Sequence, residues 1–174
     1  GDTVSNIPKH ILSNDGGANG IKVANSTTAI YDNTWHHVAM TWQKNQTFTS
    51  YLDGVQIEQR NASSTPLPSF NTQCYLGSLA GSGEFLNGSL DEVRIWTTAR
   101  SQLQIQNGIL SSSNDTSGLL MYFKFNHAIA NGNNITNYVL GNYSANSNVY
   151  GLLENFALNG NSSNWVNGII VDYG

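Results

Sequence analysis

Charged side chains are scarce in this chain. Of its 174 residues, seven are Lys or Arg and eleven are Asp or Glu, which gives a formal net charge of -4. The basic residues form no cluster that could follow a phosphate backbone or an anionic lipid surface. No apolar run approaches the roughly 18 residues that a membrane-spanning helix needs. We therefore expect no nucleic-acid partner and no insertion into a membrane.

Cysteine is rarer still, with one residue in the whole chain. A single Cys excludes an internal disulfide and a metal site built from several thiolates. The N-terminal residues GDTVSNIP include no initiating Met and lack the basic and apolar regions of a signal peptide. They predict a mature product or an excised fragment.

The chain does contain short apolar runs separated by turn residues. HHVAMTWQ (36–43) alternates, which predicts a strand with Val38, Met40 and Trp42 on one face. YLDGVQIE (51–58) carries Asp53-Gly54, a pair that favours a two-residue hairpin turn. Turn signals recur roughly every ten residues, as in an all-β sandwich. These patterns predict an all-β protein, an antiparallel β-sandwich.

One short helix is predicted after the strand that ends near Trp96. Thr98 and Ser101 are candidate N-caps. An approximate apolar face of about two turns follows before SSSND (111–115) ends the helix; its residues are Leu103, Ile105 or Gln106, and Ile109. The helix interrupts an otherwise strand-rich pattern.

A further strand is predicted in GLLMYFKFNHAI (118–129). Its apolar face is strong enough to predict burial, and the residues on that face are Leu119, Met121, Phe123 and Phe125. Beyond it, residues 131–174 are rich in Asn but keep many aromatic and branched side chains. That composition favours short strands and polar loops over disorder.

Several phrases in fixed order resemble a known family. TWHHVAMTW, YLDGVQIE, LGS and LNGSLDEVRIWTTARSQLQI are similar to the laminin-G-like, or concanavalin-A-like, jelly-roll domains of secreted and surface proteins. The resemblance covers roughly residues 34–125. The following GLLMYFKFN and GLLENFALNGNSSNWV are similar to segments that follow such domains in surface proteins of Bacteroidetes. The resemblance implies two antiparallel sheets packed face to face.

The beginning of the chain departs from this family pattern. The FDG phrase and the aromatic strand with which such domains usually begin are missing from the 33 residues before Thr34. We therefore expect residues 1–130 to form a sandwich that lacks its N-terminal strands. We expect the Asn-rich segment 131–174 to pack on the same sandwich, because uncovered sheet edges and apolar faces must be covered. A flexible linker to another domain is the alternative.

The family resemblance also implies a structural calcium ion, with Asp91 as a ligand. A carboxylate is suitable chemistry for a hard, oxygen-seeking cation. In the alternative, Asp91 and Glu92 pair with Arg94 or cap backbone amides. No other cofactor is expected.

Catalytic patterns are not recognisable in the sequence. Glycoside cleavage requires two carboxylates that flank the bond, and the eleven acids show no such pairing. His36 and His37 are adjacent, and because neighbouring strand residues point to opposite faces we interpret them as structural. We expect no enzyme activity.

Sugar binding needs a flat aromatic ring with amide or carboxylate hydrogen-bonding groups. Tyr138, Tyr143, Asn164 and Trp165 in the C-terminal loops supply this inventory and are the candidate ligand-binding residues, although each aromatic could instead belong to the core. The first hypothesis is a non-catalytic, extracellular or cell-surface module that binds a glycan or polysaccharide in adhesion. The second is a structural repeat or filament subunit that associates with copies of itself or with neighbouring domains. The third is an accessory fragment of a polysaccharide-degrading enzyme.

Overall fold

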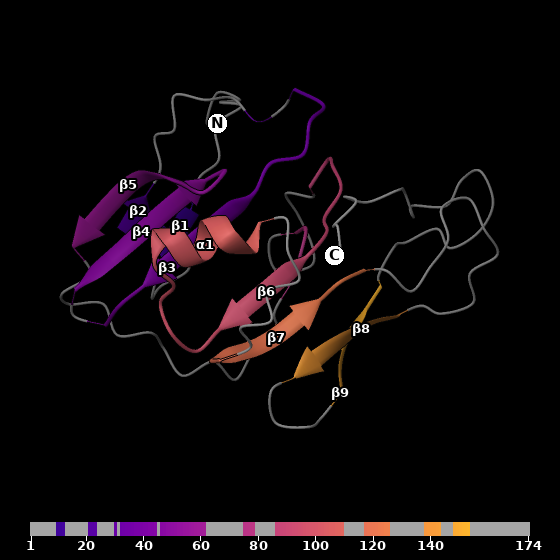
Figure 1. Ribbon diagram of the computed structural model, residues 1–174. Helices are drawn as coiled ribbons and strands as arrows, with labels where there is room; N and C mark the ends of the chain where they lie inside the picture. The colour runs from indigo at the N-terminus through magenta and orange to yellow at the C-terminus, as the bar shows by residue number, and fades with distance from the viewer. Residues whose placement is uncertain are drawn as a thin grey trace. The chain divides into compact units, whose positions relative to one another are not determined.

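The computed structural model describes ten stretches of the chain: residues 10–12, 21–23, 30, 32–44, 46–61, 75–78, 86–109, 117–125, 138–143 and 148–153. Within them, nine strands and one helix follow one another along the chain (Figure 1). The elements are β1 (His10–Leu12), β2 (Ile21–Val23), β3 (Val38–Trp42), β4 (Thr47–Leu52), β5 (Val55–Asn61), β6 (Val93–Trp96), α1 (Gln102–Gly108), β7 (Leu119–Phe123), β8 (Tyr138–Tyr143) and β9 (Asn148–Leu152).

The chain divides into two compact units. The first unit comprises residues 1–70, 99–113 and 171–174, and the second comprises 71–98 and 114–170. The described strands of the first unit are β1 to β5, and those of the second are β6 to β9. Every described pair of neighbouring strands is antiparallel.

The first unit contains a three-stranded sheet in the order β3-β4-β5. Trp42 lies opposite Phe48 and Val38 opposite Leu52, so the apolar row predicted for β3 shares a face with apolar residues of β4. The central strand β4 is buried from Phe48 to Leu52. By contrast, Met40 on β3 is 61% exposed. The core of this unit therefore lies over the central strand rather than over β3.

The hairpin between β4 and β5 turns at the predicted pair. Asp53 and Gly54 have φ angles of 49° and 75°, both positive as a type I′ turn requires. Leu52 pairs with Val55 directly across the turn. The prediction of a two-residue turn at Asp53-Gly54 is confirmed.

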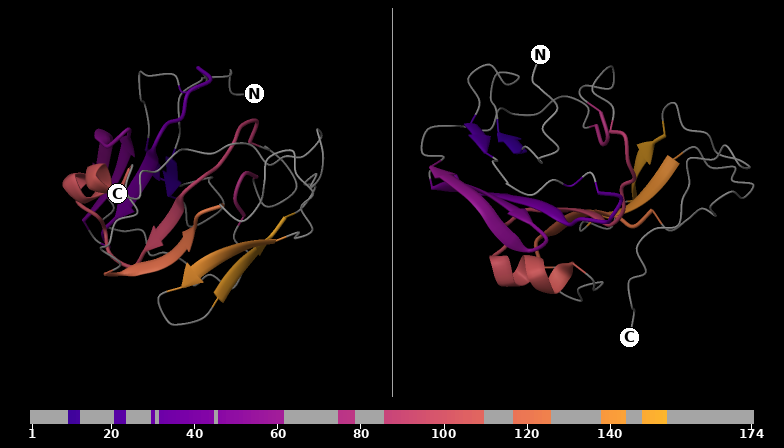
Figure 2. Two further views of the ribbon diagram at one scale, coloured as in Figure 1. Left: turned by 45° about the vertical axis from the view of Figure 1, so that its right-hand side comes forward. Right: turned by 90° about the horizontal axis from the view of Figure 1, so that it is seen from above.

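Helix α1 begins at a capping box. The Ser101 hydroxyl accepts a hydrogen bond from the backbone N–H of Gln104, and the Gln104 side chain accepts one from the backbone N–H of Ser101. Ser101 is thus the N-cap, and the two-turn helix is confirmed. The helix and the β1–β2 hairpin lie on opposite sides of the β3-β4-β5 sheet (Figure 2).

The buried side of α1 differs from the predicted face. Ile105 is buried at 7% exposure, while Gln106 donates a hydrogen bond to the Gly54 carbonyl. Leu103 is 66% exposed, so its assignment to the apolar face is wrong. Residues 103 and 105 lie about 200° apart around a helix, and burial of Ile105 therefore turns Leu103 outward.

The second unit contains a four-stranded sheet in the order β6-β7-β8-β9. Phe123 of β7 is 8% exposed and forms the centre of a cluster with partly buried Val93, Met121, Phe125 and Leu153. Burial of the predicted apolar face of residues 119–125 is thus confirmed at Phe123. Leu153 and the strands β8 and β9 come from the Asn-rich segment, so part of that segment extends the β6–β7 sheet. Packing of all of residues 131–174 on one sandwich stays a prediction.

Candidate functional site

The four predicted sugar-binding residues are described only in part. Tyr138 and Tyr143 form the two ends of β8, where they pair with Leu152 and Met121 respectively. Their side chains lie outside what the structure describes, and so do Asn164 and Trp165 entirely. A role for these residues in ligand binding stays a prediction.

A cluster of polar groups lies in the first unit, where the segment entering β3 meets the β4–β5 turn. Nδ1 of His36 is 2.8 Å from Oδ2 of Asp53. Nε2 of the same ring is 3.2 Å from both carboxylate oxygens of Asp32 and 3.1 Å from the Thr34 hydroxyl. We call Asp32, Thr34, His36 and Asp53 the His36 cluster. It joins residues that are 17 or more positions apart in the sequence across one hairpin.

The backbone holds the two sides of the His36 cluster together. The His37 N–H donates to Oδ1 of Asp53 at 2.8 Å, and the Asp53 N–H donates to the His37 carbonyl at 2.8 Å. These two bonds continue the β3–β4 ladder beyond Val38 and Leu52. The register of the hairpin therefore places the Asp53 carboxylate beside His36.

The charges of the cluster favour protonated His36. Hydrogen bonds to Asp53 and Asp32 and the charges of these carboxylates raise the pKa of His36 above its ordinary 6.5, against a smaller opposing effect of desolvation. Hydrogen bonds from the Thr34 hydroxyl and N–H are the main reason that the pKa of Asp32 lies below its ordinary 3.8. Because His36 faces acceptor oxygens with both ring nitrogens, it is placed as a donor rather than as a general base.

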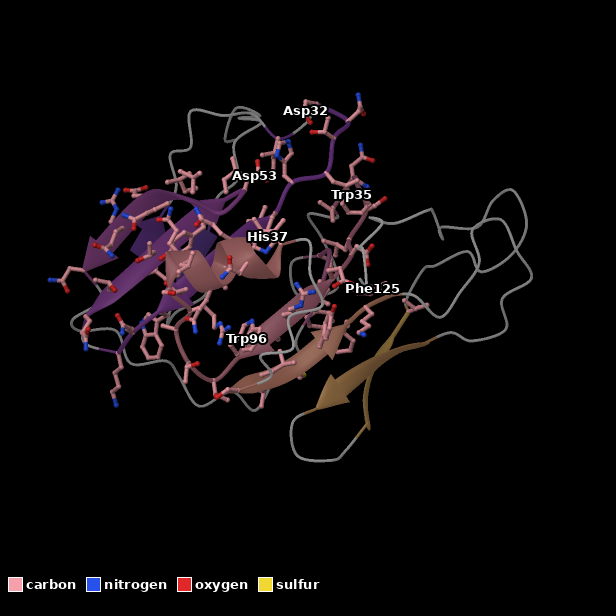
Figure 3. The ribbon with its side chains drawn as sticks, in the orientation of Figure 1. Asp32, Trp35, His37, Asp53, Trp96 and Phe125 are labelled. Atoms are coloured by element: carbon pink, nitrogen blue, oxygen red, sulfur yellow. The ribbon has the colours of Figure 1, made fainter. Side chains whose placement is uncertain are left out.

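The segment that carries this cluster also presents an aromatic ring. Trp35 is 42% exposed, and Asn33, with a φ of 63°, is exposed two residues before it. The side chains of Asp32 and Asp53 are 47% and 49% exposed. Figure 3 shows Asp32 and Trp35 on the segment that leads into β3, and Asp53 at the tip of the β4–β5 hairpin. The Trp35 ring, the Asn33 amide and the carboxylates of Asp32 and Asp53 are thus accessible to solvent.

A second polar cluster lies in the second unit. Arg94 donates to Oε2 of Glu92 at 2.5 Å and to the Tyr122 hydroxyl at 2.7 Å, and the Tyr122 hydroxyl donates to Glu92. The side chains of Arg94 and Glu92 are only 11% and 8% exposed. Burial and the bond to Glu92 raise the pKa of Tyr122 to about 12. Arg94, Glu92 and Tyr122 thus pair with one another, and Nζ of Lys124 lies 5.2 Å from the centre of the Tyr122 ring.

Asp91, the predicted calcium ligand, lies just before β6 and is partly buried. Its Oδ1 accepts a hydrogen bond from the Glu92 N–H at 2.9 Å, as the amide-capping alternative requires. Neighbouring Glu92 is committed to Arg94 and Tyr122. In the described part of the chain, no three His, Cys, Asp or Glu side chains gather to hold a metal ion. These residues do not by themselves fit a calcium site, and a calcium ion at Asp91 stays a prediction.

The alternative in which Glu92 pairs with Arg94 is confirmed, but sequence reasoning missed the His36 cluster and the contact of this pair with Tyr122, for the same reason. Each depends on a cross-strand neighbour: Asp53 reaches His36 through the β3–β4 register, and Tyr122 lies opposite Arg94 in the β6–β7 pair. The alternation of residues 119–125 placed Tyr122 on the less apolar face, although it is 8% exposed. The Asp53-Gly54 turn fixes only the β4–β5 register, whereas the β3–β4 register depends on a separate turn that is closed by the bond from the Gln43 N–H to the Thr47 carbonyl.

Comparison with known proteins identifies the family of the region that contains the His36 cluster. Residues 5–106 match a laminin G family whose description is "Concanavalin A-like lectin/glucanases superfamily". No curated protein matches the chain significantly. Among the described residues, no helix is long and apolar enough to cross a membrane.

Two solved structures are similar. A candidate carbohydrate-binding protein from Bacteroides ovatus ATCC 8483 aligns over 79% of this chain and 41% of its own, with 18% identity and a TM-score of 0.57. An S-layer domain-containing protein (residues 221–444) from Clostridium thermocellum ATCC 27405 aligns over 52% of this chain and 45% of its own, with 25% identity and a TM-score of 0.39. The chain thus spans less than half of either solved chain.

The family match covers more than half of the sequence, and the described strands are antiparallel with one short helix between them. Both agree with the predicted fold class, an all-β antiparallel sandwich. The chain belongs to the laminin G-like family of the concanavalin A-like lectin/glucanases superfamily.

Proposed function

We propose that this protein is a non-catalytic carbohydrate-binding module of a larger extracellular or cell-surface protein. The observation that carries the proposal is the exposed loop 32–35 with Asp53, which lies inside the region that matches the lectin and glucanase superfamily. Sugars are bound through stacking on flat aromatic rings and through hydrogen bonds to amides and carboxylates. Trp35, Asn33 and Asp53 supply these groups in the first unit, and all three are exposed.

The carboxylates near Trp35 support binding rather than cleavage. A glycosidase needs one acid that keeps a proton near neutral pH and a second carboxylate across the bond. Asp32 has a lowered pKa and is therefore a poor proton donor. Both ring nitrogens of His36 face carboxylate oxygens, which removes it as a free base. The groups hold one another, and the Asp32 and Asp53 side chains stay about half exposed, where a ligand can reach them.

The likeness to the Bacteroides ovatus protein adds only indirect support. At 18% identity it establishes a shared fold, and its candidate role in carbohydrate binding agrees with the proposal. We also propose that the protein acts at the cell surface or outside the cell, because the proposed ligand is a glycan or polysaccharide that is bound in adhesion. Tyr138, Tyr143, Asn164 and Trp165 remain proposed as further contacts.

The test is a glycan and polysaccharide array, followed by titration of the best ligand. We expect saturable binding that Trp35→Ala weakens about two- to tenfold, since a contact with an aromatic ring contributes about 0.5–1.5 kcal/mol beyond its buried area. Tyr75→Ala is the matched control, because Tyr75 is similarly exposed at 40% but belongs to the second unit. Uniform silence on the array, or equal losses from both substitutions, would contradict the proposed site.

A second candidate function, self-assembly, is favoured by one observation. β3 lies at the end of the described β3-β4-β5 sheet, and its Val38 and Met40 are 42% and 61% exposed. An apolar strand at a sheet edge invites pairing with another chain. Sedimentation over a range of concentrations tests this candidate: assembly through β3 predicts concentration-dependent association that Met40→Lys abolishes, and a monomer at every concentration contradicts it.

A further inference from the structure

The His36 cluster contains more acceptors than a neutral imidazole can satisfy. A neutral ring carries one N–H and one bare nitrogen. Here Nδ1 faces Oδ2 of Asp53, and Nε2 faces both Asp32 oxygens and the Thr34 hydroxyl. That hydroxyl donates its proton to Oδ1 of Asp32 at 2.8 Å, so it faces the ring as a hydrogen-bond acceptor. In a neutral ring one nitrogen would therefore point a lone pair at an oxygen lone pair.

We propose that His36 is an acid-strengthened latch between segment 32–37 and the β4–β5 turn. Protonation gives each ring nitrogen a proton, so that the ring donates to Asp53 on one side and to Asp32 on the other. Loss of that proton at higher pH removes one donor and the positive charge between two carboxylates. The tie between the segment and the turn is then weakened, although the His37–Asp53 backbone bonds remain.

The charged groups that act on His36 come from both sides of the latch. Asp32 belongs to its own segment, and Asp53 comes from the β4–β5 turn. His36 has a raised pKa, so its contribution to stability is complete below about pH 6.5 and is lost as the pH rises through the higher folded-state value. Asp32 has a lowered pKa, so its contribution is present above about pH 3.8 and is lost only as the pH falls through a lower value. Between these limits the charges of His36 and Asp32 are both in place.

The latch extends the proposed function, because Trp35 belongs to the latched segment and would be held more firmly in acid. Its test uses no sugar, so the latch and the carbohydrate proposal can fail separately. The imidazole signals of the four histidines are followed by NMR through a pH titration, and the signal missing in His36→Gln identifies His36. We expect a midpoint above 6.5 that falls in Asp53→Asn. A midpoint at or below 6.5 would overturn the proposal.

Stability gives an independent reading of the same latch. We expect the melting temperature of the wild type to exceed that of His36→Gln by more at about pH 5.5 than at about pH 8.5. Asp32→Asn, which leaves His36 and the turn in place, should lose part of the same pH dependence. It also provides the comparison if His36→Gln does not fold. Differences that are equal at the two pH values in both variants would show that no latch exists.

Discussion

At the scale of single residues, two Arg–Glu pairs in the described part of the chain differ mainly in burial. The side chains of Arg94 and Glu92 are 11% and 8% exposed, whereas those of Arg60 and Glu58 are 50% and 21% exposed. The distance from the Arg nitrogen to the Glu oxygen is 2.5 Å in both pairs. Removing one member of a buried pair leaves an uncompensated charge out of water, but an exposed charge is simply rehydrated. The same contact therefore has different consequences in the two units.

We predict that Arg94→Ala destabilises the protein by about 3–5 kcal/mol, because Glu92 and the Tyr122 hydroxyl lose their cation. The matched control is Arg60→Ala, for which we expect a loss of about 0–1 kcal/mol. Chemical denaturation of both variants at neutral pH measures the difference. Equal losses would mean that the buried cluster is not intact in solution.

The ionisation of Tyr122 supplies a second test of this cluster. Its pKa of about 12 exceeds the ordinary value of 10, so the neutral phenol is favoured in the folded protein. The stability that this provides is present below about pH 10 and is lost as the pH rises through about 12. We expect an ultraviolet titration to show one tyrosine that ionises late, and Tyr122→Phe to remove that late step. A late step that survives in Tyr122→Phe would assign it to another tyrosine.

At the scale of secondary-structure elements, the β4–β5 hairpin illustrates what local sequence can specify. Asp53-Gly54 predicted the turn and with it the β4–β5 register, whereas the contact of Asp53 with His36 depends on the separate β3–β4 register. Ser101 and Gln104 likewise form a capping box, whose Ser-x-x-Gln pattern can be read directly in the sequence. By contrast, the exposed side of α1 depends on where the helix docks, which no local pattern contains.

Gly54 is required at its position for two reasons. Its φ is 75°, and a Cβ there would lie 2.7 Å from Cγ of Gln106 and 3.1 Å from Cδ1 of Ile109. We predict that Gly54→Ala costs roughly 1–2 kcal/mol from the backbone alone, plus the cost of displacing α1. Gly108→Ala is the control, since a Cβ there meets nothing within 4 Å and Ala favours a helix. A lower melting temperature for Gly108→Ala than for Gly54→Ala would contradict the described contact between the turn and the helix.

At the scale of the whole molecule, the C-terminal third contributes to the second unit. β8 pairs with β7, β9 pairs with β8, and Leu153 packs against Phe123. Sequence predicted the apolar strand at residues 119–125, because alternation marks it. It did not predict the order β6-β7-β8-β9, since strand order is set by long-range pairing that leaves no mark in the Asn-rich segment.

Truncation tests this contribution. We predict that a fragment ending at Asn131 loses stability and associates, because removal of β8, β9 and Leu153 opens the edge of β7 and uncovers Phe123. Denaturation and sedimentation of the fragment beside the full chain measure both effects. A fragment as stable and as monomeric as the full chain would mean that residues 132–174 act only as a linker.

The most direct test of the central claim, binding without cleavage, is one calorimetric titration. The full chain is titrated with the polysaccharide that the array selects, and the same sample is assayed afterwards for newly formed reducing ends. We predict saturable binding by the wild type, weaker binding by Trp35→Ala, and no reducing ends from either protein. Reducing ends that accumulate with the wild type, or the absence of binding to every polysaccharide, would contradict the claim.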